Sequence, residues 1–194
     1  LVASGDFNGD GILDVAVSAY ATGTMNVLLG RGNGTFGAAV SYADFGTASI
    51  LCGDFNGDGA TDLVTSNYSS NTLSLRHGTG SGAFGAATAI STEDFPKSVS
   101  AGDFNGDGAL DLVSADWFAG TASVFHGSSS GLGATPARVL EGAATGDWFG
   151  FSVASAGDVD GDGFADLVVG AFMADPGGRD TAGAASVFHG SPGG

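Results

Sequence analysis

The sequence predicts an all-β protein, a β-propeller made of four-stranded antiparallel blades, of which about four are present. The main observation is a nine-residue motif, rich in aspartate and glycine, that begins at Asp6, Asp54, Asp103 and Asp158. Successive copies start 48, 49 and 55 residues apart (6 to 54, 54 to 103, 103 to 158), which is the length of a propeller blade. Each copy runs into a short apolar, β-prone segment, and 36 glycines with only 13% charged residues suit short strands and tight turns.

Each repeat is expected to contain a strand, the acidic loop, a strand, a turn, a strand, a glycine-rich turn and a last strand. The expected strands cover residues 1–4, 14–18, 25–29 and 38–42 in the first repeat, 48–52, 63–66, 72–77 and 86–91 in the second, and 98–101, 112–115, 121–126 and 137–140 in the third. The interval from the first loop aspartate to the glycine after the third strand is 24 residues in these repeats (6 to 30, 54 to 78, 103 to 127). It is 32 residues in the fourth repeat (158 to 190), so a longer loop is expected around residues 174–181.

The repeats cover approximately residues 1–44, 45–94, 95–146 and 147–194, all within one propeller region. The fourth repeat lacks an outer strand in this reading, and the first begins with an inner strand, so no spare strand fills the gap. A ring of blades with unsealed ends exposes sheet edges and apolar faces. We therefore expect further blades from a longer chain, or self-association with a second copy.

The acidic loops have the composition of Ca²⁺ sites. Side-chain oxygens stand at positions 1, 3, 5 and 9, glycines stand at positions 4 and 6, and position 7 offers a backbone carbonyl. Ca²⁺ takes six to eight oxygen ligands, and clustered carboxylates repel one another unless a cation lies among them. The predicted ligands of four Ca²⁺ ions are Asp6, Asn8, Asp10, Ile12 and Asp14; Asp54, Asn56, Asp58, Ala60 and Asp62; Asp103, Asn105, Asp107, Ala109 and Asp111; and Asp158, Asp160, Asp162, Phe164 and Asp166.

The residues after each loop separate it from other calcium motifs. An EF-hand has a bidentate glutamate at position 12, whereas these loops have Val17, Thr65, Ser114 and Val169. Dockerin loops continue into a helix, thrombospondin-type repeats are rich in cysteine, and nonapeptide β-helix repeats recur at much shorter intervals. Without the glutamate, we expect affinities at the weak end, on the order of 10⁻⁴–10⁻³ M, with the all-aspartate fourth loop the tightest.

The fourth repeat carries the fullest family signature. It reads Phe149-Gly150, then Ser152-Val153-Ala154, then the loop DVDGDGFAD, and then residues 167–171, with Phe172 in place of a proline. On these residues the chain resembles the FG-GAP family, also called VCBS-type repeats, of the integrin α-subunit β-propeller. The first three repeats are similar to the bacterial-type form, with DFNGDG. The resemblance implies a propeller with calcium in the loops, and a face opposite the loops that binds protein ligands in integrins and sugars in the lectins of the family.

Composition limits the kinds of partner that the protein is expected to bind. The net charge is −16, but 13 of the 21 acidic residues occupy loop ligand positions, three in each of the first three loops and four in the last. Four Ca²⁺ ions would halve this excess, and the acidity argues against a nucleic-acid partner. No apolar run approaches the length of a membrane helix, so no membrane insertion is expected. Weak calcium sites fill outside cells, which favours a secreted or cell-surface location.

Aromatic residues recur at fixed positions on the side expected to lie opposite the loops. Tyr20, Tyr68, Trp117 and Phe172 each follow the ninth loop residue by six positions, and Phe45, Phe95 and Phe149 precede the inner strands. One interpretation is packing between blades. The other is a ligand-binding face on which Tyr20, Tyr68, Trp117 or Trp148 stacks against a sugar ring or anchors an extracellular protein.

The remaining chemically notable residues indicate structural roles. His77, His126 and His189 share one position at the end of the third strand, where the first repeat has Leu29, and they are too far apart for one common metal site. Cys52 is the one cysteine and is expected in the core. Loop carboxylates that bind a cation are poor general acids, and no catalytic triad emerges, so no enzymatic activity is expected. The expected function is a calcium-binding adhesion or protein-recognition module, with a calcium-dependent carbohydrate-binding module as the alternative.

Overall fold

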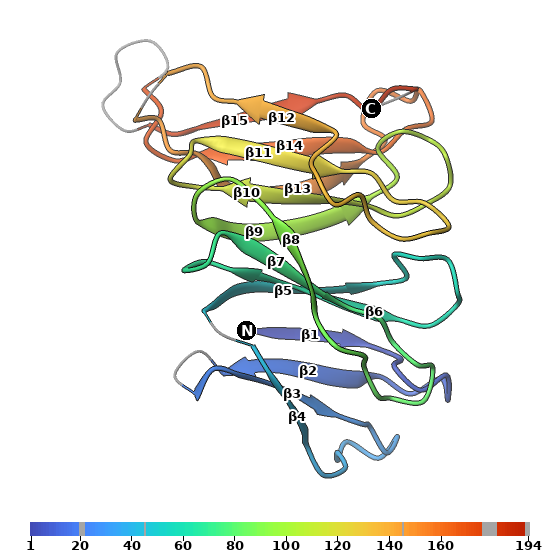
Figure 1. Ribbon diagram of the computed structural model, residues 1–194. Helices are drawn as coiled ribbons and strands as arrows, with labels where there is room; N and C mark the ends of the chain where they lie inside the picture. Colours follow the sequence, from blue (N-terminus) through green and yellow to red (C-terminus); the bar gives the residue numbers. More distant parts are fainter. Residues whose placement is uncertain (20–21, 45, 145, 176–181, 193–194) are drawn as a thin grey trace.

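The structure is a computed structural model that describes residues 1–19, 22–44, 46–144, 146–175 and 182–192. Four antiparallel sheets follow one another along the chain (Figure 1). The strands are β1 (Val2–Gly5), β2 (Asp14–Ala19), β3 (Thr24–Leu28) and β4 (Val40–Ala43) in the first sheet; β5 (Thr47–Gly53), β6 (Asp62–Asn67), β7 (Thr72–Arg76) and β8 (Thr88–Ser91) in the second; β9 (Pro96–Gly102), β10 (Asp111–Asp116), β11 (Thr121–Phe125) and β12 (Arg138–Glu141) in the third; and β13 (Phe149–Gly157), β14 (Asp166–Ala171) and β15 (Ala184–Phe188) in the fourth.

The all-β fold class and its blade-like sheets are confirmed. In every sheet the strands pair in chain order, and each of the twelve strands expected in the first three repeats overlaps an observed strand. The fourth sheet has three strands within the described residues, in agreement with the expected lack of an outer strand. No helix in the described part of the chain is long and apolar enough to cross a membrane.

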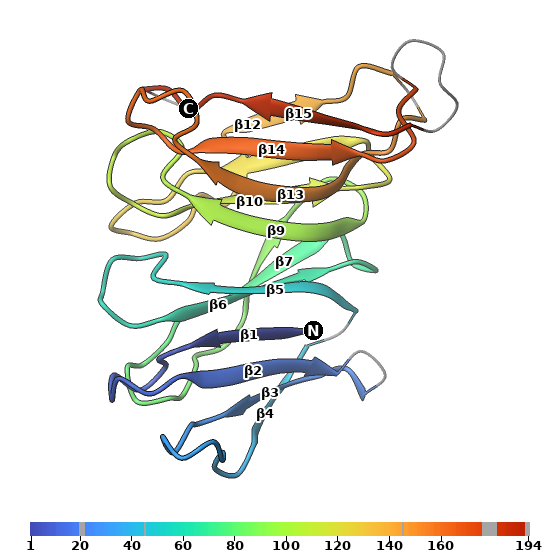
Figure 2. The ribbon, with the colours of Figure 1, turned by 180° about the vertical axis from the view of Figure 1, so that it is seen from behind.

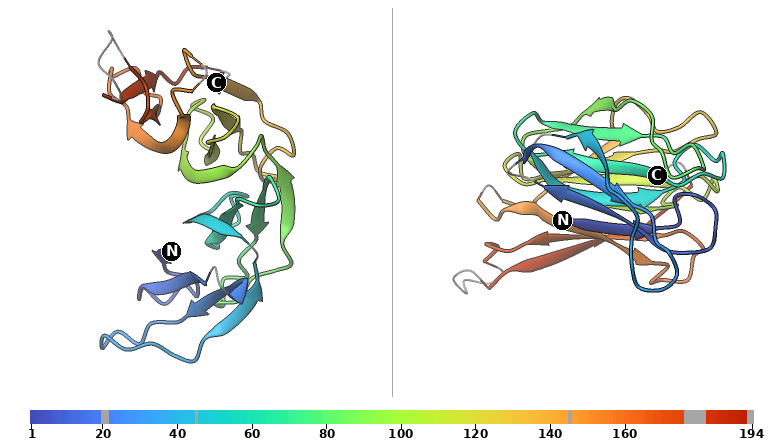
Figure 3. Two further views of the ribbon diagram at one scale, coloured as in Figure 1. Left: turned by 90° about the vertical axis from the view of Figure 1, so that its left-hand side faces the viewer. Right: turned by 90° about the horizontal axis from the view of Figure 1, so that it is seen from below.

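The sheets are arranged around an open arc. The first strand of each sheet lies beside the first strand of the next, because β5 contacts both β1 and β9, and β9 contacts β13 (Figure 2). Viewed from the side, the sheets fan out from this row of inner strands, and the first sheet does not meet the fourth (Figure 3). This is the radial arrangement of propeller blades, without closure.

The antiparallel meander sorts the loops onto two sides. The acidic loops connect the first and second strands of each sheet, and register pairs such as Gly5 with Asp14 and Gly53 with Asp62 close them. The turns between the second and third strands therefore lie at the other end, where Asp116 pairs with Pro96 and Thr121. The acidic loops and these turns lie on opposite sides of the molecule (Figure 1).

The hydrophobic core lies between neighbouring sheets as three separate clusters. The first unites Phe7, Met25 and Val27 of the first repeat with Leu63 and Phe84 of the second. Cys52 packs against this cluster, and its thiol donates to the Ser4 carbonyl oxygen at 3.2 Å. The second cluster contains Phe55, Val64, Leu73, Leu75, Ile90, Val99, Leu112 and Phe125, and the third contains Phe104, Val113, Ala115, Ala122, Val124, Leu140, Phe149, Val153, Leu167, Val169, Ala171 and Ala174.

The second residue of each of the first three acidic loops enters the cluster formed with the next sheet. Phe7, Phe55 and Phe104 are only 1%, 1% and 6% exposed, whereas the equivalent Val159 of the fourth loop is 56% exposed. Val187, on β15, is also 50% exposed. The loop residue is thus covered where another sheet follows it, and the fourth sheet presents an apolar surface.

Among the described residues, two carboxyl groups are buried away from the loops, those of Asp44 and Asp116. Asp116, at the end of β10, accepts hydrogen bonds of 2.6 Å from the hydroxyls of Ser114 and Ser123. Burial raises its pKa to about 7, against the opposing effect of the two hydroxyls, and the nearby negative charge of Glu93 raises the pKa further. The folded protein therefore holds this proton at a pH where the unfolded chain has lost it.

We expect Asp116→Asn to flatten part of the pH dependence of stability. The folded-state pKa lies above the ordinary value of 3.8, so the wild type loses stability as the pH rises from about 4 to about 7. The shift corresponds to at most about 4 kcal/mol in the difference between variant and wild type across this window. Urea denaturation in chelator at several pH values measures it, with the exposed Asp175→Asn as the control. Parallel profiles of the wild type and Asp116→Asn would contradict the expectation.

Candidate metal sites and the aromatic face

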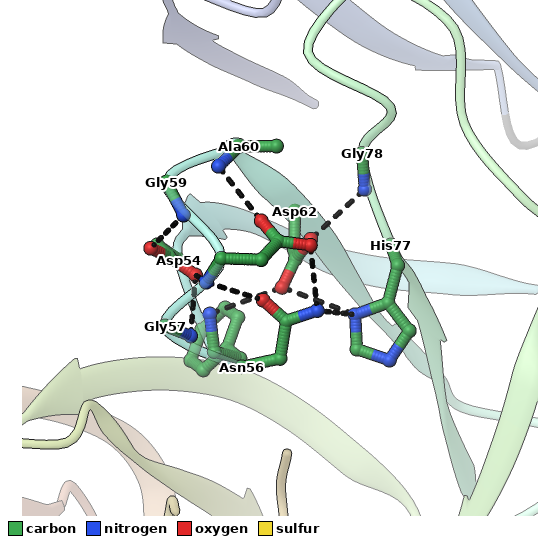
Figure 4. Close-up of polar contacts among 10 residues, drawn as sticks. Asp54, Asn56, Gly57, Gly59, Ala60, Asp62, His77 and Gly78 are labelled. Atoms are coloured by element: carbon green, nitrogen blue, oxygen red, sulfur yellow. Dashed lines mark hydrogen bonds and ion pairs between the residues drawn. The ribbon is translucent and has the colours of Figure 1, made fainter. Parts of the chain in front are cut away.

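The first aspartate of each loop organises the loop backbone. Asp54 accepts the N–H of Gly57 at 2.7 Å with one carboxylate oxygen and the N–H of Gly59 at 2.9 Å with the other (Figure 4). Asp6, Asp103 and Asp158 accept the equivalent pair of glycine N–H groups at 2.6–3.0 Å. Gly57 and Gly59 have φ values of 70° and 85°, which residues with a Cβ rarely adopt. The sharp glycine turn thus wraps the backbone around the carboxylate.

In the first three loops the fifth position is exposed, and the third and seventh positions beside it are half-buried. Asn56 donates from its amide nitrogen to the Asp58 carboxylate at 2.9 Å, and Asp58 accepts the N–H of Ala60 at 2.8 Å. The bond from Ala60, followed by the bond from Asn56, lowers the pKa of Asp58, and corresponding bonds lower the pKa of Asp107. These carboxylates are therefore ionised at neutral pH. The same N–H to carboxylate bond is made by Ile12, Ala109 and Phe164, and the role of these residues as carbonyl ligands stays a prediction.

The ninth aspartate is buried and links the loop to the rest of its sheet. Asp62 is 0% exposed; one oxygen accepts the N–H of Phe55 at 3.0 Å, and the other accepts the N–H of Gly78 at 2.9 Å. Gly78 directly follows the third strand, so one side chain joins the start of the loop to a segment 16 residues away. Asp14, Asp111 and Asp166 are equally buried and make the same pair of bonds, at 2.7–3.0 Å.

The donor set of the loops fits a hard cation. In the fourth loop, carboxylate oxygens of Asp158, Asp160 and Asp162 lie within 4.8 Å of one another. Three negative charges at this separation repel unless a cation lies among them, and ligands that are all oxygen suit Ca²⁺. The first three loops bring together the same positions with Asn8, Asn56 and Asn105 as the neutral member.

A family model for the FG-GAP-like repeat matches residues 6–65, 54–114 and 103–169. Each match begins at the first aspartate of a loop and together they cover most of the chain, with the fourth loop inside the third match. The chain belongs to the FG-GAP-like repeat family. A search of curated proteins gives no significant match.

The FG-GAP-like repeats of this chain place a histidine against three of the four loops. His77 Nδ1 lies 3.2 Å from Asp62, His126 Nδ1 lies 3.4 Å from Asp111, and His189 Nδ1 lies 3.1 Å from Asp160. The prediction that the histidines do not share one site holds, but sequence reasoning missed that each contacts its own loop. The signal was present: each histidine precedes the glycine that bonds to the ninth aspartate.

On the opposite side, the aromatic residues of the second to fourth FG-GAP-like repeats form a continuous array. Trp117 stacks on Tyr68 with ring centroids 6.0 Å apart and meets Trp148 edge to face at 5.2 Å. Phe95, Phe118, Phe151 and Phe172 extend the array through further ring contacts. Phe149 instead lies in the core between sheets. Tyr20 and Phe45, also predicted on this side, lie outside the described residues.

A cleft of about 270 Å³ opens beside this array. Trp117 and Trp148 line it together with Thr121 and Glu141, whose strands pair directly. The Thr121 hydroxyl is buried and has no hydrogen-bond partner among the described residues. The cleft thus combines two aromatic walls with the exposed carboxylate of Glu141.

Two of the aromatic residues adopt an unusual backbone conformation. Phe95 and Trp148 have φ values of 59° and 54°, in the left-handed region, and each directly precedes an inner strand. Gly46 occupies the same place in the second repeat, with a φ of 76°. A residue with a Cβ costs on the order of 1 kcal/mol in this conformation, and such strain concentrates at binding sites. In this conformation Phe95 contacts Tyr68 and Phe118, and Trp148 contacts Trp117 and Phe172.

The two classes of loop aspartate should respond differently to substitution. We expect Asp62→Asn to lower the free energy of unfolding by about 2–4 kcal/mol even in excess chelator, because an amide cannot accept both buried N–H groups. The exposed Asp58→Asn should have an effect within about 0.5 kcal/mol in chelator and act only when Ca²⁺ is present. Urea denaturation with and without Ca²⁺ distinguishes them, and equal effects in chelator would contradict the buried-anchor role of Asp62.

Proposed function

We propose that the chain is a calcium-binding β-propeller module that stabilises its blades with Ca²⁺ and presents its aromatic side for extracellular ligand recognition. The observation that carries the proposal is the fourfold recurrence of one loop geometry. In each copy a glycine turn wraps the first aspartate, exposed oxygens cluster at the middle, and a buried aspartate ties the loop to its sheet.

The first, third, fifth and ninth side chains of each loop, with the seventh carbonyl, would hold one Ca²⁺. The ion would supply positive charge among carboxylates that otherwise repel one another. The chain itself holds the loop in position. The glycine N–H groups orient the first carboxylate, and the second residue anchors the loop in the core between sheets. Binding to the folded state alone stabilises it by about 2.7 kcal/mol per site when the ion is at a hundredfold excess over the dissociation constant.

The weak affinity expected of loops without a bidentate glutamate implies a compartment with abundant Ca²⁺, so we place the protein outside the cell or on its surface. The carboxylates of the loops serve as cation ligands, and we propose no catalytic role for the chain. We propose a protein ligand for the aromatic side, where Trp148, Phe118 and Phe172 are exposed. Aromatic residues of this kind form the centres of protein interfaces.

The cleft beside Trp117 and Trp148 favours a second candidate function, the binding of a carbohydrate. Aromatic rings stack on the apolar face of a sugar ring, and the Glu141 carboxylate offers an acceptor for sugar hydroxyls. The two candidates share one surface and differ in the chemistry of the ligand.

Removal of Ca²⁺ tests the first half of the proposal. We expect the melting temperature in millimolar Ca²⁺ to fall by about 10 °C or more in excess chelator, because up to four ions leave the folded state. Mg²⁺ at the same concentration is the control, and light scattering reports whether the mass changes with the metal. An unchanged melting temperature would mean that the loops are only glycine–aspartate turns, and would contradict the calcium function.

Substitution of Trp117 tests the ligand face. If the ligand is a carbohydrate, binding to a glycan array in Ca²⁺ should be lost in Trp117→Ala and retained in Phe36→Ala, an exposed aromatic of the first repeat. The loss should exceed about tenfold, since stacking of a ring against tryptophan contributes more than 1 kcal/mol. A wild-type protein that binds no glycan in a broad array would exclude the carbohydrate candidate and leave the protein ligand.

A further inference from the structure

The fourth loop contains a second, overlapping group of metal-binding side chains. Besides the three exposed carboxylates, the ligand atoms of Asp160, Asp166 and His189 all lie within 4.8 Å of one another. Asp160 belongs to both groups. One group offers oxygen ligands only, and the other offers two oxygens and an imidazole nitrogen.

The distances within the second group match a small transition-metal ion. His189 Nδ1 lies 3.1 Å from Asp160 Oδ2 and 3.4 Å from Asp166 Oδ1. Zn²⁺ binds imidazole nitrogen and carboxylate oxygen at about 2.0–2.2 Å, so two ligands of a tetrahedral site are separated by about 3.3 Å. The His189 and Asp160 side chains are 54% and 40% exposed, so an ion from solvent can reach them, whereas Asp166 is fully buried and forms the inner end of the group.

The position of the histidine is built into the repeat. His77 and His126 occupy the same place, and both direct Nδ1 towards the ninth aspartate of their loops. The Nδ1 atom of His126 is buried, and it has no hydrogen-bond partner among the residues that the structure describes. His77 Nδ1 lies between the Asn56 amide nitrogen at 3.3 Å and the Asp62 oxygen at 3.2 Å, and a single ring nitrogen cannot both accept from the first and donate to the second (Figure 4). Hydrogen bonds within the protein therefore do not fully satisfy the Nδ1 atoms of His77 and His126.

The first repeat shows that the imidazole is not needed for the loop fold. Leu29 takes the place of the histidine, yet Gly30 makes the same bond to the ninth aspartate, Asp14, at 2.7 Å. The histidine therefore adds an imidazole nitrogen, a possible metal ligand, to a loop that forms without it. Imidazole nitrogen is a poor ligand for Ca²⁺ and a good one for Zn²⁺ and neighbouring transition metals.

We infer that the fourth loop is a second type of metal site, at which His189, Asp160 and Asp166 bind a divalent transition-metal ion such as Zn²⁺ in competition with Ca²⁺. This inference rests on the proposed role of the loops as cation sites. The fourth loop is the one that combines the histidine with an aspartate at position 3; the second and third loops have Asn56 and Asn105 there, and the first has Leu29. Zinc binding at this loop would displace calcium, because Asp160 serves both groups.

Zinc titration of the untagged, metal-free chain by calorimetry tests the inference. We expect one Zn²⁺ per chain to bind more tightly than any further equivalents, and saturating Ca²⁺ to weaken this binding. His189→Leu, which reproduces the residue of the first repeat, should lower the zinc affinity by at least about tenfold. His77→Leu, the matched control in the second loop, should change it by less than about twofold.

His189→Asn separates a metal ligand from a hydrogen-bonding residue. The asparagine amide can still donate to Asp160 but cannot replace imidazole as a zinc ligand, so we expect zinc binding to fall as it does in His189→Leu. Zinc affinity retained in His189→Asn, or unchanged in both variants, would overturn the inference. Calcium titrations of the same proteins distinguish the failure of this inference from the failure of the proposed function. Absence of calcium binding would contradict the proposed function, whereas a zinc affinity that does not depend on His189 would contradict only this inference.

Discussion

A buried carboxylate that accepts two backbone N–H groups is the interaction on which each repeat depends. The ninth loop aspartate joins the start of the loop to the glycine after the third strand, so three segments of a sheet converge on one side chain. Burial of an ion is unfavourable unless its hydrogen bonds are satisfied, and here two N–H groups satisfy it. Because the adjoining Phe7, Phe55 and Phe104 enter the cores between sheets, the same contact also aligns the loop with the neighbouring blade. The conformation of the loop, the pairing of strands in its sheet and the packing against the next sheet are therefore coupled.

The meander separates two kinds of chemistry. Every loop between a first and second strand lies on one side, where aspartates and histidines gather, and every turn between a second and third strand lies on the other, where the aromatic array extends over three repeats. A cation bound at a loop and a ligand bound at the aromatic array would thus be connected through the strands. Coupling between the two would depend on how firmly the loops hold the sheets in register.

The sequence was informative wherever a feature repeats at short range. Loop positions, strand order and the side occupied by Tyr68 and Trp117 follow from spacing and from the alternating direction of strands. Contacts between segments far apart in sequence are less accessible. The sequence indicates structural roles for the histidines, whereas in the structure each lies against its own loop, because their register against the ninth aspartate depends on the sheet. The sequence predicts Phe149, like Phe95, before its inner strand. In the structure Phe149 is the first residue of β13, and Trp148 takes the place of Phe95, with a positive φ directly before the strand. The burial of Asp116 left no sequence signal, since Asn67 and Ala19 take its place in other sheets.

The buried phenylalanine of the loop gives the row of sheets a direction along the chain. Each of the first three repeats packs its loop phenylalanine against the sheet that follows it in the chain, as Phe7 does against Phe84 of the second repeat through an edge-to-face contact at 5.4 Å. The loop phenylalanine of a sheet is therefore covered by the next sheet in the chain and not by the sheet before it. Repeats of this kind could be lengthened or shortened by whole units in evolution, because each added sheet has only to cover the loop phenylalanine of the sheet before it.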